Sequence, residues 1–240
     1  MLHSLLDFIR ALDDGSLRWV NQFAGHSLLF DGLMGQLVNS ELIKVGVLVA
    51  MLYWLWFKTD GDVHERRHRV IMALPSAAVA IIVGRAMALA LPFRLRPFVR
   101  EDLGWTPLEH FDTFVDAWSA FPSDTSMFTF AIATTIWLNS RRLGWLAWLY
   151  VAVVVCLPRW YTGLHHPSDL IAGAVIGIAI PLLVGKIALM RRMTDPIQGF
   201  ADAQPGVFHA LVFLTMYQLT TLFGGLRILG KLLLTLYRGG

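Results

Sequence analysis

The sequence has few charged residues and almost no cysteine. Asp, Glu, Lys and Arg together make up 15% of its 240 residues, whereas a soluble domain usually contains about 25%. The single cysteine, Cys156, excludes a disulfide framework within the chain. The net charge of +3 is small, and the basic residues lie at the ends of apolar segments, so we expect no nucleic-acid partner.

The chain is instead rich in hydrophobic residues, which make up 56% of it and give a mean hydropathy of +0.57. Apolar runs of the length that crosses a bilayer, roughly 17–25 residues, recur along the sequence. We therefore predict an all-α fold, a polytopic membrane helix bundle of five or six spans in a single integral membrane domain. The five clearest spans are residues 41–57, 70–92, 124–139, 144–158 and 168–190.

Both ends of the chain differ from this predicted core, residues 41–190. Residues 1–40 mix apolar and charged side chains, which is typical of amphipathic helices at the membrane interface. Residues 191–240 are predicted to form a C-terminal membrane-associated segment. Within it, residues 207–239 are apolar but carry ionisable groups. A sixth span, a surface helix, or one followed by the other all remain open for this stretch.

Lys and Arg are concentrated in three connections, residues 58–69, 139–144 and 186–192, which the span pattern puts on one side of the membrane. The positive-inside tendency predicts that this side is cytoplasmic. Residues 93–123 and 159–168 then meet on the outer face. Positive charge is not favoured there, so we expect the arginines of these two loops to have a function. They are Arg94, Arg96, Arg100 and Arg159.

The predicted outer face suits a phosphate group. Guanidinium groups donate paired hydrogen bonds to phosphate oxygens. Ser123 or Asp124 can cap a helix that begins in "PSDTS", and the free N–H groups of such an end attract anions. A second helix begins at "HPSD", with Pro167 in its first turn. Two helix N-termini and several arginines therefore converge on one region.

The segment "RWYTGLHHPSDLIAG", residues 159–173, supplies a candidate reactive histidine. His165 lies four residues before Asp169, and His166 lies three residues before it. A carboxylate that holds one ring nitrogen fixes the tautomer and leaves the other nitrogen to attack a substrate or move a proton. Both spacings suit such a contact, so spacing from Asp169 does not choose between the two histidines.

These residues resemble the signatures of a known family. Arg159, His165 and Asp169 have the spacing of the third signature of the type-2 phosphatidic acid phosphatase superfamily of membrane lipid phosphatases. "FPSDTS" resembles the second signature, Pro-Ser-Gly-His, and "FRLRPF" resembles the Arg-Pro end of the first. "NQFAGHSLLFDGLM", residues 21–34, is similar to the start of the bacterial branch that includes undecaprenyl-diphosphate phosphatases.

The resemblance implies a role for each residue of the candidate site. His165 would be the nucleophile that forms a phosphohistidine, and Asp169 would orient it. The phosphate would be held by arginines and by groups at the start of a helix, and no metal or cofactor is expected. The substrate would be a prenyl diphosphate or a related lipid phosphate, in a multi-pass protein of the bacterial cytoplasmic membrane whose site faces outside. The implied phosphate-binding residues are Arg96, Arg159, Ser123, Asp124 and Arg94.

The sequence departs from the family pattern at two positions. Leu89 stands where the first signature has a lysine, for which Arg85 or Arg94 could substitute. Thr125 stands where the second signature has the histidine that protonates the leaving group, and a threonine hydroxyl is a very poor acid. Other acids could replace it, namely Asp124, His166 or His110.

The missing histidine affects possible substrates unequally. An alcohol that leaves a phosphate monoester needs a proton, whereas a phosphate that leaves a diphosphate has a conjugate acid with a pKa of about 6. Arginines can neutralise that phosphate as it leaves. Thr125 therefore favours a diphosphate or another anhydride as substrate. The alternative hypotheses are a degenerate relative that binds or transports a lipid phosphate without hydrolysing it, and a purely structural membrane subunit.

Overall fold

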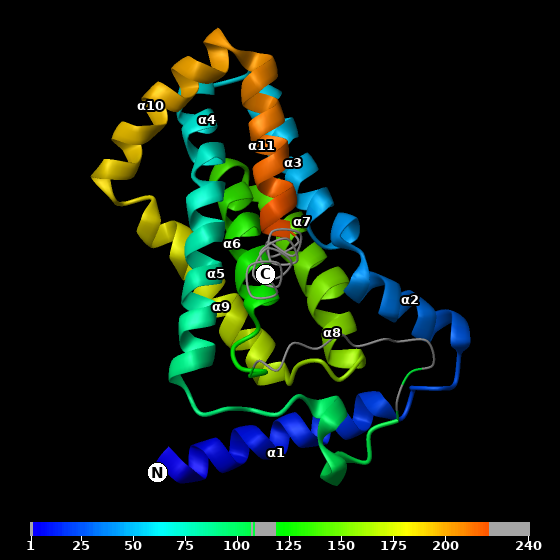
Figure 1. The fold of residues 1–240 in the computed structure, drawn as a ribbon. Helices are drawn as coiled ribbons and strands as arrows, with labels where there is room; N and C mark the ends of the chain where they lie inside the picture. Colours follow the sequence, from blue (N-terminus) through cyan, green and yellow to red (C-terminus); the bar gives the residue numbers. More distant parts are fainter. Residues whose placement is uncertain (1, 107, 109–118, 221–240) are drawn as a thin grey trace, which may run out of the picture.

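The computed structural model describes residues 2–106, 108 and 119–220, and all regular secondary structure in this part of the chain is helical. The all-α prediction is thus confirmed for the described residues. Figure 1 shows a bundle of long helices with α1 lying across one end. The α-helices are α1 (Leu2–Asn21), α2 (Leu28–Asn39), α3 (Val47–Phe57), α4 (Val63–Ile71), α5 (Ala73–Ala90), α6 (Asp124–Asn139), α7 (Arg141–Tyr150), α8 (Leu157–Tyr161), α9 (Pro167–Val184), α10 (Ala188–Ala203) and α11 (Pro205–Thr220).

Three helical stretches are long and apolar enough to cross a membrane, namely Val63–Ala90, Arg141–Tyr161 and Pro167–Val184. A bent pair, Leu28–Asn39 with Leu42–Phe57, would form a fourth span across a 66° bend. The described residues therefore form a multi-pass membrane bundle with three or four candidate spans. The count of five or six spans remains a prediction.

The predicted span at residues 124–139 is a helix, α6, but it is short and enclosed. Its 16 residues extend about 24 Å, less than the ~30 Å hydrocarbon core of a bilayer. The helix contacts α3, α5, α7 and α9, and its residues from Ser126 to Ile136 are all buried. Protein rather than lipid surrounds most of this helix, which explains why its length does not match the bilayer.

The contact between α6 and α9 depends on two glycines of α9. A Cβ atom added at Gly177 would lie 2.3 Å from the Met127 carbonyl oxygen, and one at Gly173 would lie 2.6 Å from the Ser123 carbonyl oxygen. Small residues let two helix backbones approach closely in a membrane bundle. This approach also brings the starts of the helices together, where the Ser123 amide donates to the Asp169 carbonyl oxygen at 3.2 Å.

The described parts of the two loops that the sequence predicts to meet, residues 93–106, 119–123 and 159–168, do lie at one end of the bundle (Figure 1). The Phe98 amide donates to the Gly163 carbonyl oxygen at 3.0 Å, and the Ala120 amide donates to the Arg94 carbonyl oxygen at 2.9 Å. The basic connections after α3 and α6 lie at the opposite end. The side of the membrane that each end faces stays a prediction.

The first helix, α1, lies across the same end as these loops (Figure 1). It buries Asp13 and Leu17 against the bundle and leaves Phe8, Leu12 and Trp19 exposed. An exposed apolar stripe on a helix of this orientation suits the plane of a membrane interface. The interfacial location predicted for residues 1–40 nevertheless remains a prediction.

The C-terminal part begins with α10, which crosses the other end of the bundle, and α11, which returns along it (Figure 1). Val212 and Met216 of α11 pack into the main apolar core beside residues of α3 and α5. The three alternatives for residues 207–239 are open beyond Thr220, because residues 221–240 lie outside the described part of the chain. The C-terminal membrane association therefore remains a prediction.

Replacing Gly177 by alanine should destabilise the bundle, because the new methyl group would overlap the backbone of α6. We expect Gly177→Ala to lower the free energy of unfolding by about 1–3 kcal/mol, measured by denaturant titration in mixed micelles. Gly199→Ala is a matched control in α10, where a Cβ atom meets nothing within 4 Å. That control should be neutral or raise the stability by up to about 1 kcal/mol. Equal effects of both changes would contradict the close-packing explanation.

Candidate active site

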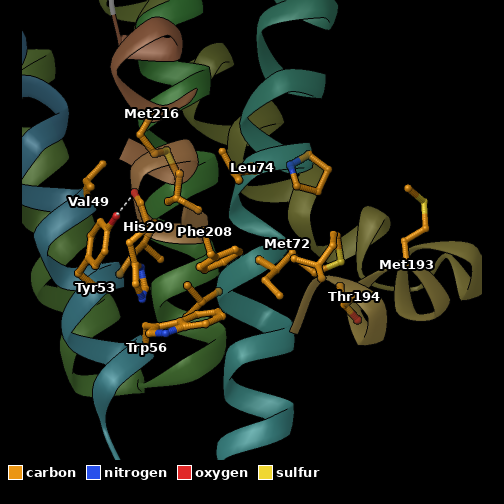
Figure 2. Close-up of a pocket in the computed structure, with 16 residues that line it drawn as sticks. Val49, Tyr53, Trp56, Met72, Leu74, Met193, Thr194, Phe208, His209 and Met216 are labelled. Carbon is orange, nitrogen blue, oxygen red and sulfur yellow. Dashed lines mark hydrogen bonds between the residues drawn. The ribbon is translucent and has the colours of Figure 1, made fainter. Parts of the chain in front are cut away.

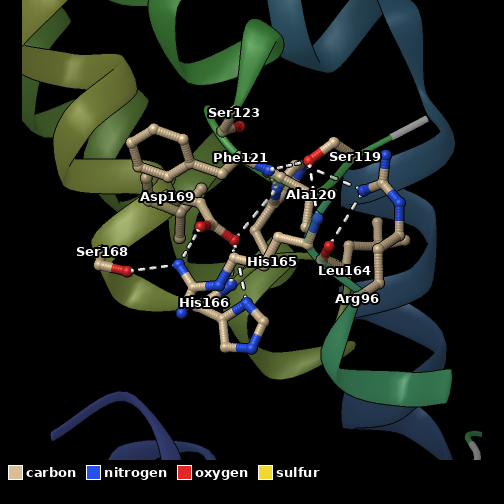
Figure 3. A network of polar contacts seen from close by, with 12 residues as sticks. Arg96, Ser119, Ala120, Phe121, Ser123, Leu164, His165, His166, Ser168 and Asp169 are labelled. Atoms are coloured by element: carbon tan, nitrogen blue, oxygen red, sulfur yellow. Dashed lines mark hydrogen bonds and ion pairs between the residues drawn. The ribbon is translucent and has the colours of Figure 1, made fainter. Parts of the chain in front are cut away.

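His165 lies in the short connection between α8 and α9, and only 4% of its surface is exposed. Its Nδ1 atom is 2.9 Å from the Ala120 carbonyl oxygen and 3.8 Å from Asp169 Oδ2 (Figure 3). A carbonyl oxygen only accepts hydrogen bonds, so Nδ1 must be the nitrogen that carries the proton. In the neutral ring, the lone pair is then on Nε2.

The Nε2 atom of His165 faces Arg96, whose Nη1 is 3.2 Å away and also donates to the Leu164 carbonyl oxygen at 3.0 Å (Figure 3). His165 and Arg96 line a small cavity, into which Arg85 and Asp124 also project. Arg85 Nη2 is 3.0 Å from Asp124 Oδ2. The cavity thus has two guanidinium groups, one carboxylate and one unprotonated ring nitrogen at its wall. Its remaining lining residues are Gly84, Ala88, Ser119 and Pro122.

Asp169 has no exposed side-chain surface, and each of its oxygens has a different set of partners. Arg94 Nη1 is 2.5 Å from Oδ1. The His166 amide donates to Oδ2 at 2.8 Å, and His166 Nδ1 is 3.1 Å from the same oxygen. His166 caps α9 in a reciprocal capping box and does not line the small cavity. The structure therefore separates the two histidines, with His166 at the helix cap and His165 at the cavity.

Burial sets the charge of His165. It lowers the pKa of the imidazole, because a charged ring would lose its hydration. The nearby Asp169 carboxylate opposes this effect and the Arg96 guanidinium adds to it, so the pKa stays below the usual value of about 6.5. The ring is therefore mainly neutral at neutral pH, with its lone pair directed at Arg96.

Besides Asp169 and Arg94, three of the predicted site residues lie near the cavity but do not line it. Arg159 is buried, donates from Nη1 to the Val155 carbonyl oxygen at 2.9 Å, and accepts the His165 amide on its own carbonyl oxygen. Ser123 caps α6 by accepting the Ser126 amide at 3.3 Å. Thr125, in the first turn of α6, donates to Asp124 Oδ1 at 3.4 Å.

The two candidates for the missing lysine have different surroundings. Arg85 lines the cavity, whereas Arg94 lies behind Asp169 and bonds to that carboxylate, to Ser168 and to Asp13. Leu89 itself is 73% exposed. The geometry favours Arg85 as the second cation of the cavity.

Two residues of this region are not indicated by the sequence. Ser119 lines the cavity and accepts the Arg94 amide at 3.1 Å, but an isolated serine in a long loop carries no signal. Asp13 lies far away in the sequence, and only the folded chain brings it to Arg94. His110, one of the alternative acids, lies outside the described residues.

A larger cavity of about 310 Å³ lies at the opposite end of the bundle, between α3, α5, α10 and α11 (Figure 2). Its described lining is apolar and aromatic and includes no Arg, Lys, Asp or Glu. Tyr53 donates to the His209 carbonyl oxygen at 3.4 Å within it. This cavity lacks the charges that a phosphate requires, so it does not compete with the His165 cavity as the candidate site.

Comparison with known families identifies this arrangement. The sequence model of the PAP2 superfamily matches residues 69–193, just over half of the chain, and this range contains the His165 cavity. The chain belongs to the PAP2 superfamily. PAP2 is the type-2 phosphatidic acid phosphatase superfamily that the three signatures resemble, so the resemblance is confirmed.

Two curated PAP2 relatives show similar levels of identity. The chain is 33% identical over 134 residues to the bacitracin transport permease protein BcrC of Bacillus licheniformis. It is 34% identical over 143 residues to the putative undecaprenyl-diphosphatase YbjG of Escherichia coli (strain K12). The matches cover 56% and 59% of this chain, and they span 60% and 65% of the two relatives. The likeness therefore falls short of the relatives' full length.

Two solved structures are similar to the described fold. The PAP2-type phosphatidylglycerolphosphate phosphatase of Bacillus subtilis has a TM-score of 0.50 and 17% identity, over 74% of this chain and 84% of that one. Aquifex aeolicus LpxE has a TM-score of 0.48 and 24% identity, over 71% and 93%. At such identities, the Bacillus structure supports the fold alone.

The lowered pKa of His165 predicts how the stability of this PAP2 protein depends on pH. The contribution of the neutral buried ring is present above a pH of about 6.5 and is lost as the pH falls through the lowered pKa, because the unfolded chain binds the proton more readily. The wild type should therefore lose more thermal stability between pH 7.5 and 5.5 than His165→Asn does. The measurement is thermal unfolding in detergent at both pH values, and parallel losses in the two proteins would contradict the assignment.

Proposed function

We propose that the chain is a membrane lipid phosphatase or phosphotransferase that acts on a prenyl diphosphate or a related lipid phosphate through a phosphohistidine. The observation that carries the proposal is the tautomer of His165. The Ala120 carbonyl oxygen holds the proton on Nδ1, so the lone pair of Nε2 faces Arg96 Nη1, and both residues line a cavity that Arg85 also lines. A neutral, oriented ring nitrogen opposite two cations is the arrangement that nucleophilic attack on phosphorus needs.

In the proposed reaction, the Nε2 lone pair forms a bond to the terminal phosphorus, and the bond from that phosphorus to the bridging oxygen breaks. The leaving group departs with the electron pair of this bond. Arg96 and Arg85 hold the non-bridging oxygens, and the Asp169 carboxylate, 3.8 Å from Nδ1, stabilises the positive ring of the intermediate. A water molecule or an acceptor hydroxyl then attacks the phosphorus and loses its proton to solvent. The bond between Nε2 and phosphorus breaks, and its electron pair returns to Nε2 to restore the neutral histidine.

The residues around the cavity indicate which leaving group the site can accept. Thr125 and His166 do not line it, and the Asp124 carboxylate is ion-paired with Arg85. The described residues thus offer no histidine other than His165 to protonate an alkoxide. A prenyl phosphate, which leaves as an anion, suits these surroundings better than the alcohol of a monoester. The name of the Escherichia coli relative, a putative undecaprenyl-diphosphatase, supports the same substrate class.

The site is proposed to face outside, in a multi-pass protein of the bacterial cytoplasmic membrane. Support comes from the basic connections at the opposite end of the bundle, such as residues 58–69, because such segments usually remain cytoplasmic. The substrate would then be a lipid whose diphosphate is exposed on the outer leaflet. Membrane lipids would surround the rest of the bundle.

A second candidate function is binding or transport of a lipid phosphate without hydrolysis. The departures at Leu89 and Thr125 favour it, as does the name of the Bacillus licheniformis relative, a transport permease protein. Tight binding of a prenyl diphosphate with no phosphate release, and no gain on Thr125→His, would select this function over the enzymatic one.

Replacing the proposed nucleophile should abolish activity. We expect the purified wild type to release phosphate from a prenyl diphosphate in detergent micelles, and His165→Ala to lower kcat/KM by more than about 1,000-fold. His64→Ala, at an exposed histidine of α4 at the other end of the bundle, should leave the rate unchanged. Phosphate release by His165→Ala at the wild-type rate would rule out the phosphohistidine.

Restoring the family's histidine should help substrates with poor leaving groups. Thr125→His places a longer, acidic side chain on the first turn of α6, near Asp124. We expect kcat/KM for phosphatidic acid and phosphatidylglycerol phosphate to rise by at least roughly tenfold relative to that for a prenyl diphosphate. The assay compares the three substrates in the wild type and in this variant. Equal changes for monoesters and diphosphate would contradict the assignment of the leaving group.

A further inference from the structure

Helix α1 brings a buried carboxylate, Asp13, to the end of the bundle that holds the site. Asp13 is 2% exposed. Its Oδ1 accepts the Ser168 amide at 3.0 Å, and its Oδ2 accepts the Ser168 hydroxyl at 2.6 Å and Arg94 Nη2 at 2.6 Å. A buried carboxylate is tolerated only when donors replace its water, and these three donors do so.

The Asp13 carboxylate occupies the N-terminus of α9, where the sequence predicts an anion. Ser168 is the second residue of this helix, so its amide is one of the donors that a helix leaves unpaired. The partial positive charge of the helix end favours a carboxylate there. The anion at this helix end is therefore supplied by the chain itself, from a residue about 155 positions away.

Arg94 connects Asp13 to the catalytic carboxylate. Its Nη2 bonds to Asp13, and its Nη1 bonds to Asp169 Oδ1 at 2.5 Å, so one guanidinium lies between two buried carboxylates. The other oxygen of Asp169 faces the two histidines. Asp13 thus fixes the orientation of the Arg94 guanidinium. Arg94 in turn fixes the orientation of the Asp169 carboxylate, which faces Nδ1 of His165.

We propose that Asp13 is a positioning residue for the His165 site and acts through Arg94 on Asp169. This proposal rests on the proposed function, because it assumes that His165 is the nucleophile. It goes beyond the family match, which begins at residue 69 and leaves the whole of α1 outside. Helix α1 is then part of the catalytic machinery and does more than attach the bundle to a surface.

The neighbouring acids of α1 have other partners. Asp14 is paired with Arg100 at 2.6 Å and is partly exposed. Asp7 lies 4.0 Å from Arg10, and both side chains are 74% exposed. Asp13 is the acid of this helix that reaches the arginine behind Asp169. Asp7 therefore provides a matched control on the same helix, remote from the site.

Loss of the Asp13 charge should shift the protonation of His165 in one direction. The charged groups around His165 are Arg96, Asp169, Asp124 and the Arg85 that pairs with Asp124. His166 contacts the same Asp169 oxygen, and Arg94 adds positive charge behind Asp169. Without the Asp13 charge, Asp169 is the one carboxylate of the pair that still balances the positive charge of Arg94. The uncompensated positive charge disfavours protonation of His165, so the acid limb of the pH–rate profile should move to lower pH.

The test compares wild type, Asp13→Asn and Asp7→Asn for phosphate release from a prenyl diphosphate in detergent micelles. We expect Asp13→Asn to lower kcat by about 10–100-fold, because small displacements of catalytic groups have effects of this size. KM should change by less than about threefold, because Asp13 does not line the cavity. The acid limb should shift to lower pH, and Asp7→Asn should match the wild type in all three respects.

Arg94→Gln tests the same link from its other side and remains informative if Asp13→Asn does not fold. The two changes should be non-additive, with the double variant losing no more kcat than the more severe single variant. The proposal would be overturned if the Asp13→Asn variant folds, is less stable than the wild type, and keeps the wild-type kcat and pH profile. A folded Arg94→Gln variant with the wild-type kcat and pH profile would also overturn it. An inactive wild type would instead overturn the proposed function together with the positioning role.

Discussion

The Asp169 carboxylate is completely buried at the start of α9, and the protein groups that replace its lost hydration arrange Arg94, His166 and His165 around it. One oxygen bonds to Arg94, and the other bonds to the amide and ring of His166 and faces His165. The close approach of α6 and α9 at the two glycines of α9 brings Asp169 beside the start of α6. A single buried charge therefore links the packing of the bundle to the orientation of His165, the proposed nucleophile.

The sequence predicts the helical core well, because apolar runs of membrane-spanning length have few alternative structures. It also identifies His165, but only through the spacing from Arg159 that the family signature supplies. The structure provides an independent physical reason, since the Ala120 carbonyl oxygen fixes the tautomer of His165 while His166 caps α9. Neither contact is visible in the spacing, because Ala120 is 45 residues away from His165 in the sequence.

The sequence indicates individual phosphate-binding residues less well, because the local sequence does not determine where a long side chain ends. Arg159 and Ser123 bond to the backbones of their own helices. Arg94 forms ion pairs with two carboxylates, one of which comes from α1. Such long-range pairings depend on the folded topology. The residues next to Asp13 in the sequence do not indicate that it pairs with Arg94. Apolar length does not fix the number of spans, because the enclosed helix α6 need not match the thickness of the bilayer.

The ion pair between Arg85 and Asp124 means that the small cavity carries a carboxylate before any phosphate enters it. In the proposed function, an incoming phosphate would compete with Asp124 for Arg85, so binding there would be an exchange of anions rather than a simple addition of charge. Such an exchange favours the binding of ligands that carry more than one negative charge, because they interact with Arg85 more strongly than a single carboxylate does. It also makes affinity fall as ionic strength rises, since salt anions enter the same competition.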